Sequence, residues 1–335
     1  MLRTALYERH RALGARLVEF GGWEMPLQYP TGIVEEHLAT RREAGLFDVS
    51  HMGRFRLRGG GALALLQHAL TGNAAALTPG QAQYTMIPDE GGGARDDAYL
   101  YCLGQADYLL VVNAANREAD WEYLRTLLGY FPEAQLAEAT QELAMLSLQG
   151  PGCRRILLEV AGAEALPEPG RNNLLVIGPR RLGALAPGCV VARTGCTGEA
   201  LGFELFVPAA EAASLWDRLA AAGATPVGLA PGTPCAWRRP SLCMGTSWAW
   251  IRRGSRSPSF PARWPGSPSP SARSKGRSSA GRPWPGSRSP ISGPCAGIGA
   301  VWRICPDERA PWSCRSGGWP ARAAPWNGTA NRRAG

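Results

Sequence analysis

The chain changes composition after Ala230, and this break limits how much of it can form an ordinary folded core. Residues 1–230 carry 19 Lys and Arg against 25 Asp and Glu, a net charge of −6, whereas residues 231–335 carry 17 against 2, a net charge of +15. The second segment also holds 9 of the 12 Trp and 16 of the 28 Pro residues. The overall net charge of +9 therefore does not describe residues 1–230, which have the composition of a globular protein.

Three interpretations of residues 231–335 compete: a disordered arm that binds nucleic acid, an anchor at a membrane surface, and DNA read in the wrong frame. Abundant Trp argues against ordinary disorder, and no amphipathic helical spacing supports an anchor. In GC-rich DNA, CTG followed by a codon that begins with G gives TGG, a Trp codon, when it is read one base late. With GC-rich codons, residues 231–251 can then spell RDTLRLEAAQPLYGHELGLD, which has helical periodicity and balanced charge. We predict a frameshifted, disordered segment that binds neither nucleic acid nor membranes.

The first 230 residues lack the signals of secretion, membrane insertion and metal binding. Residues 1–13 disperse their leucines among charges, unlike a signal peptide, and no run approaches the roughly 18 apolar residues that span a bilayer. Their cysteines form no CxxC pair, so they indicate neither a zinc site nor a disulfide framework. These features predict a cytoplasmic protein without a metal.

Hairpins mixed with single helices predict an α+β fold with antiparallel sheets. Residues 98–102 and 108–113 have the pattern of paired strands. Residues 33–44 have the spacing of an amphipathic helix that ends at Gly45, whereas residues 21–26 are expected to form an irregular loop. The glycine patterns of nucleotide-binding loops are missing, so the sequence does not support phosphate binding.

Residues 90–101 place three glycines before two adjacent carboxylates, Asp96 and Asp97. Glycines permit a tight hairpin turn or the close approach of a flat ligand. Because neighbouring side chains of a strand point to opposite faces, we do not expect Asp96 and Asp97 to serve the same site. One is a candidate for chemistry and the other for structure.

Six segments resemble, in order and spacing, the aminomethyltransferase family, the T proteins of the glycine cleavage system. They are LYERHRALGARLVEFGGWEMPLQY, REAGLFDVSHMG, QYTMIPDEGGGARDD, LLVVNAANREAD, LSLQGP and RTGCTGEALGFELFVP. The resemblance covers nearly all of residues 2–230, and the frame-corrected string is similar to the family's next block. It implies ferredoxin-like subdomains built from antiparallel sheets and helices in residues 1–230, followed by a β-barrel that is not recognisable in residues 231–335.

The resemblance implies transfer of a one-carbon unit. Family members take the aminomethyl group from the lipoyl arm of the H protein, release ammonia and deliver the carbon to tetrahydrofolate. By this resemblance Asp96 is the catalytic carboxylate, Asp97 braces the turn, and Glu199 accepts hydrogen bonds from the amino and ring N–H groups of the pterin. His51 is expected to be structural. Aromatic, thioether and amide side chains would line the folate pocket: Tyr84, Tyr101, Met52 and Asn113.

Two departures from the family pattern predict that the chain as written is impaired or inactive. Cys196 stands where the family has Tyr, and the Arg expected after Gly228 and Leu229 appears only in the corrected frame. Two alternatives stay open: another folate-dependent transferase or demethylase of the same superfamily, and a non-catalytic folate-binding module. An enzyme should lose turnover when Asp96 is replaced by Asn, with folate affinity little changed, whereas a binding module should be indifferent.

Overall fold

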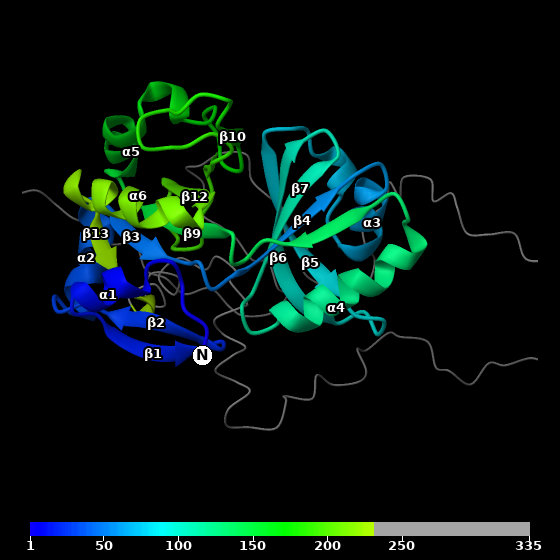
Figure 1. The fold of residues 1–335 in the computed structure, drawn as a ribbon, viewed down its shortest axis with the longest axis horizontal. Coiled ribbons are helices and arrows are strands. Elements are labelled where there is room, and N and C mark those ends of the chain that lie inside the picture. Colours follow the sequence, from blue (N-terminus) through cyan, green and yellow to red (C-terminus); the bar gives the residue numbers. More distant parts are fainter. Residues whose placement is uncertain (231–335) are drawn as a thin grey trace, which may run out of the picture. The chain divides into compact units, whose positions relative to one another are not determined.

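The computed structural model describes residues 1–230, which form two large β-sheets, a two-stranded hairpin and six α-helices (Figure 1). All but one of the strand pairings are antiparallel, which confirms the predicted α+β class. The predicted frameshifted segment and the position of the family's β-barrel lie outside the described residues. None of the helices in residues 1–230 is both long and apolar enough to cross a bilayer.

The first large sheet has five antiparallel strands and carries helices on one face. Its strand order is β5 (Gln81–Pro88), β6 (Ala94–Gly104), β7 (Asp107–Val112), β4 (Gly53–Arg58) and β8 (Gln135–Glu138). Figure 1 shows this sheet with its two helices, α3 (Ala62–Ala69) and α4 (Arg117–Leu127). Short 3-10 turns follow them at Ala74–Ala76 and Leu128–Tyr130.

The second large sheet has six strands, of which only β13 and β3 run parallel to each other. The order is β10 (Leu174–Val176), β11 (Val190–Ala192), β12 (Gly202–Pro208), β9 (Leu143–Gln149), β3 (Gly45–Asp48) and β13 (Thr225–Val227). Its helical face packs on α5 (Cys153–Ala161) and α6 (Ala209–Ala221), and a 3-10 turn, Ala163–Ala165, follows α5.

The N-terminal segment contains α1 (Tyr7–Ala12), the hairpin of β1 (Arg16–Phe20) and β2 (Trp23–Gln28), and α2 (Ile33–Arg42). The prediction of an irregular loop over residues 21–26 is wrong. Gly21 and Gly22 both have positive φ, so they make a two-residue turn that pairs Phe20 with Trp23. Gly45 does not end the helix either; it begins β3, where an added Cβ would overlap the Thr40 hydroxyl.

Each large sheet is buried on both faces. Successive side chains of a strand point to opposite faces, and in these strands the side chains on both faces are largely apolar. One face packs on helices, and we call the opposite one the inner face. Residues from both inner faces form one hydrophobic cluster. The five-stranded sheet supplies Ala82, Tyr101, Leu109 and Val111, and the six-stranded sheet supplies Met145, Leu174, Val190, Ala192 and Phe206. The contact between the sheets is therefore part of the core.

Backbone atoms pack closely around Gly150, the residue that follows β9. Its φ is 126°, and an added Cβ would lie 2.6 Å from the Glu43 carbonyl oxygen and still closer to that of Thr40. Gly162 also has positive φ, 84°, but has no atom within 4 Å of the added Cβ. We expect Gly162→Ala to lower the free energy of unfolding by about 1–2 kcal/mol through φ alone. Gly150→Ala should cost about 1–3 kcal/mol more because rigid backbone is overpacked. Equal losses in urea unfolding would contradict this packing.

Candidate functional site

A row of tyrosines lies on the inner face of β5 and β6. Tyr84 is opposite Tyr99 in the strand register, and Tyr99 and Tyr101 are alternate residues of β6, so their side chains share one face. The ring centroids of Tyr84 and Tyr99 lie 6.2 Å apart, and those of Tyr99 and Tyr101 lie 5.3 Å apart. Tyr84 is 38% exposed and Tyr101 is fully buried. The row therefore leads from solvent into the contact between the sheets.

Asp97 lies next to the exposed end of this tyrosine row. The Tyr84 hydroxyl donates to Asp97 Oδ2 over 3.1 Å, and the Asn113 side-chain amide donates to Asp97 Oδ1 over 2.8 Å. Burial, together with the neighbouring charge of Asp96, raises the pKa of Asp97. The same amide donates to Asp96 Oδ1 over 2.8 Å, and the Asn113 backbone N–H donates to Asp96 Oδ2 over 3.0 Å. We call Asp96, Asp97 and Asn113 the carboxylate cluster.

The expectation that the two aspartates serve different sites is wrong in one respect, since one amide joins both. Asn113 follows the last residue of β7, so its amide reaches both carboxylates at the end of the ladder. Because successive side chains of β6 point to opposite faces, the other contacts of Asp96 and Asp97 are different. Asp97 shares the face of the tyrosine row, whereas Asp96 shares the helix-covered face and accepts from the Asn116 amide at the start of α4, over 2.9 Å.

The buried end of the tyrosine row meets a second carboxylate, Glu204 of β12. The Tyr101 hydroxyl donates to Glu204 Oε2 over 2.7 Å, and the Thr194 hydroxyl donates to the same oxygen. Burial raises the pKa of Glu204, and burial together with the Glu204 charge raises that of Tyr101 well above its usual range. The ring of Phe206, two residues further along β12, lies 5.0 Å from Tyr101. The site thus spans both sheets.

Glu199 is held by contacts that are separate from the carboxylate cluster. It lies in the loop that follows β11, where Arg41 of α2 forms an ion pair with its carboxylate and donates to the Thr197 carbonyl oxygen over 3.1 Å. The Thr197 hydroxyl donates to Gln149 of β9 over 2.9 Å, which ties this loop to the sheet. Cys196 of the same loop is exposed. The proposed contact between Glu199 and a pterin stays a prediction.

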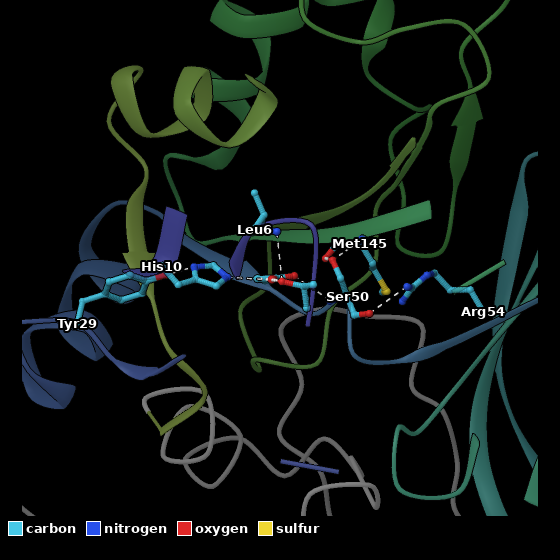
Figure 2. Close-up of polar contacts among 8 residues, drawn as sticks. Leu6, His10, Tyr29, Ser50, Arg54 and Met145 are labelled. Atoms are coloured by element: carbon cyan, nitrogen blue, oxygen red, sulfur yellow. Dashed lines mark hydrogen bonds and ion pairs between the residues drawn. The ribbon is translucent and has the colours of Figure 1, made fainter. Parts of the chain in front are cut away.

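Met52 packs against the cluster of the inner faces, and the loop that carries it rests on buried polar contacts (Figure 2). Ser50 exchanges hydrogen bonds with the backbone of Met145 in β9, at 3.2 and 2.9 Å. Arg54 donates to the carbonyl oxygens of Ser50 and Met52. Burial lowers the pKa of Arg54 to about 10 and that of His51 to about 4, so Arg54 is charged at neutral pH and His51 is not. A neutral, buried His51 agrees with a structural role.

Asp48 joins this loop to the N-terminal segment. It accepts from the Thr4 hydroxyl over 2.7 Å, from His10 Nε2 over 2.9 Å and from the Ser50 backbone N–H over 2.9 Å. Burial alone would raise the pKa of Asp48, but these donors hold it at about 2. Burial also keeps the Tyr29 hydroxyl protonated, so it donates to His10 Nδ1 over 2.8 Å. His10 therefore links Tyr29 to Asp48 through its two ring nitrogens (Figure 2).

Sequence reasoning missed Tyr99 and Glu204 and treated Asp97 only as a brace. Positions 97, 99 and 101 share one face of a strand, so the alternation of β6 contained the signal for two of them. Nothing local marked Glu204, because its partners come from a different sheet and a different loop. Within residues 1–230, His, Cys, Asp and Glu side chains form no group that could hold a metal ion.

Replacing Asp48 tests the contacts beneath the Met52 loop. Asp48→Asn leaves buried donors without an anionic acceptor, and we expect the free energy of unfolding to fall by about 3–5 kcal/mol at pH 7. Because the pKa of Asp48 is about 2 in the folded state against 3.8 ordinarily, its contribution is complete above pH 4 and declines toward pH 2. The difference between the two proteins should therefore shrink as pH falls through this window in chemical denaturation.

Asp107→Asn is the matched control for this experiment. Asp107 is paired with Arg56 at 2.9 and 2.7 Å, but both side chains retain solvent contact. This substitution should cost about 1 kcal/mol or less. If Asp48→Asn costs no more than Asp107→Asn, the buried contacts do not support the loop.

Comparison with known proteins finds aminomethyltransferases that this chain is similar to. The family model described as "GCVT N-terminal domain" matches residues 6–237. An aminomethyltransferase of Deinococcus deserti is 44% identical over 227 residues, covering 68% of this chain and 61% of that protein. One from Thermus thermophilus is 43% identical over 264 residues, covering 75% and 72%.

A solved structure leads to the same family. The crystal structure of glycine cleavage system aminomethyltransferase T from Bartonella henselae matches with a TM-score of 0.61 and 35% identity, over 69% of this chain and 60% of that chain. The chain thus spans about three fifths of the length of the Deinococcus and Bartonella proteins.

Proposed function

The chain belongs to the GCVT N-terminal domain family, the family of the aminomethyltransferases, and from that membership we propose the reaction that it performs. The proposed reaction moves the aminomethyl carbon from the lipoyl arm of the H protein to tetrahydrofolate and releases ammonia. Tetrahydrofolate is the co-substrate and the lipoylated H protein is the partner. The proposed compartment is the cytoplasm.

The observation that carries this proposal is the tyrosine row with a carboxylate at each end. A pterin is flat and rich in N–H donors, so it suits a slot with aromatic walls and a few anionic acceptors. Tyr84 and Tyr99 supply ring faces and edges near solvent, and Asp97 supplies the acceptor beside them. Met52, with its polarizable thioether, packs against the same inner cluster. These residues fit the proposed co-substrate without a metal.

The faces of β6 favour Asp97 over Asp96 for direct contact with the reacting groups. Asp97 shares the tyrosine face, and its Oδ2 already accepts from the half-exposed Tyr84. A carboxylate there can accept a hydrogen bond from a folate nitrogen and stabilise the cation that forms as ammonia leaves. The pKa of Asp97, raised by burial and by Asp96, also suits the carboxylate to receive a proton. Asp96 then acts from the opposite face, through Asn113.

Glu199 is proposed to contact the amino edge of the pterin, as its family position implies. Arg41 holds its carboxylate in place, and an Arg–carboxylate pair leaves lone pairs of the oxygens for further donors. The family's Arg after Leu229 appears only in the corrected reading frame. We therefore propose that the chain as written turns over more slowly than one with the frame restored after Ala230.

Asp97→Asn and Asp96→Asn, made in the full chain and in the frame-restored chain, test these roles. Ammonia release from aminomethylated H protein with tetrahydrofolate should fall by about 10²–10⁴ in Asp97→Asn, because the acid–base and electrostatic group is lost. Asp96→Asn should lose less. Folate affinity, measured by calorimetry, should change less than about tenfold in both variants.

Three outcomes would overturn parts of this proposal. Turnover that is unchanged in both variants, with folate still bound, would favour a non-catalytic folate-binding module. A larger loss in Asp96→Asn would return the direct role to Asp96. A frame-restored chain that binds tetrahydrofolate but releases no ammonia from aminomethylated H protein would point to another folate-dependent transferase or demethylase.

A further inference from the structure

Asp120 of α4 is a fully buried acid that none of the site chemistry described so far uses. Its exposed fraction is 0%, and neither of its carboxyl oxygens accepts a hydrogen bond from an N–H or O–H group in residues 1–230. Leu124 and Leu127, further along the same helix, belong to the helix-side core of the five-stranded sheet. An ionised carboxylate in such surroundings, without donors, would be strongly destabilising.

Asp120 lies directly behind the carboxylate cluster. Its backbone N–H donates to the Asn116 carbonyl oxygen over 2.9 Å, and the Asn116 amide donates to Asp96. The carboxyl group of Asp120 is within hydrogen-bonding reach of Asp96. The charges of Arg95 and of Asp97, which points to the other face of β6, also act on it. Asp96 and Asp120 therefore form a pair of buried acids across the sheet–helix interface.

One proton is enough to satisfy this pair, and the donors decide which acid holds it. Two carboxyl groups in contact and out of water do not both ionise. Asp96 accepts from the Asn113 backbone, the Asn113 amide and the Asn116 amide, so its negative charge is well stabilised. Asp120 has no such donors, and burial together with Asp96 raises its pKa to about 9. The proton thus belongs on Asp120.

We propose that Asp120 is a positioning residue, a neutral acid that donates its proton to Asp96 and holds Asp96 as the anion that orients the Asn113 amide. Because Asn113 joins Asp96 to Asp97, the proton of Asp120 sets the orientation of the amide that contacts Asp97. Because Asp120 is neutral, it also adds no second negative charge beside Asp96. This role rests on the proposed function only in its last step, the effect on Asp97.

The pH dependence of unfolding tests the shared proton without an activity assay. Between about pH 5 and pH 8 the folded protein holds one proton on Asp120 that the unfolded chain has lost, so its stability falls as pH rises. Asp120→Asn keeps an N–H donor toward Asp96 and removes this proton. The unfolding equilibrium constant of the wild type should therefore rise about tenfold per pH unit relative to the variant. A constant ratio across this range would overturn the proposal.

Infrared spectroscopy gives a second measurement, which does not depend on whether Asp120→Asn folds. A protonated carboxylic acid has a carbonyl band distinct from that of a carboxylate. The wild type should show this band at pH 7 and lose it near pH 9. In Asp96→Asn, where the neighbouring charge and acceptor are gone, it should disappear at a lower pH. A wild type with no acid band at pH 7, or an Asp96→Asn protein with the same titration, would overturn the proposal.

A separate experiment measures the effect of Asp120 on turnover. Asp120→Leu, which removes the donor, should shift the pH profile of turnover in the frame-restored chain, whereas Asp120→Asn should restore most of the wild-type profile. If unfolding and infrared data show the shared proton but the profiles coincide, Asp120 is a stabilising residue with no positioning role. If the chain has no turnover at all, the proposed function fails while the shared proton stands.

Discussion

The burial of two sheet faces against each other is the constraint on which the rest of the structure depends. Each large sheet already covers one face with helices, so its other face must find a second apolar partner. Residues such as Tyr101, Leu109 and Phe206 meet there and exclude water. Any polar group that the strands place in this contact must then be satisfied inside the protein. In the candidate site, the buried groups that accept these internal hydrogen bonds are carboxyl groups.

The acids of the site are stabilised in different ways, and the differences divide their roles. Asp48 has hydroxyl, ring and backbone donors and therefore a lowered pKa, which suits a structural anchor. Asp97 and Glu204 have fewer donors and raised pKa values, which suits groups that exchange protons or accept from a ligand. Asp120 has no donors and stays neutral. The number of hydrogen-bond donors around each acid thus decides whether it is held as an anion, can exchange a proton, or stays neutral.

Much of the fold could be predicted because its signals are local. The paired strands over residues 98–102 and 108–113 and the helix that begins at Ile33 follow from hydrophobic spacing, and the structure has all three. Strand β2 was missed because a two-glycine turn resembles a loop when no partner strand is in view. The short strands β8 and β13 were missed for a related reason, since they are defined by the strands they pair with rather than by their own four or three residues.

The sequence by itself determined the family and the α+β class, because both follow from the order and spacing of residues along one chain. The resemblance to the family also suggested Tyr84, Tyr101 and Asn113 as pocket residues, but it did not suggest Tyr99 or Glu204. Only the tertiary structure decided how the acids are used. Alternation along β6 places Asp97 on the face of Tyr99 and Tyr101, but its contact with Tyr84 depends on the pairing of β5 with β6. The partners of Glu204 and Asp120 likewise come from elements distant in sequence. The protonation of a carboxyl group depends on its surroundings in space, and the order of residues does not contain those surroundings.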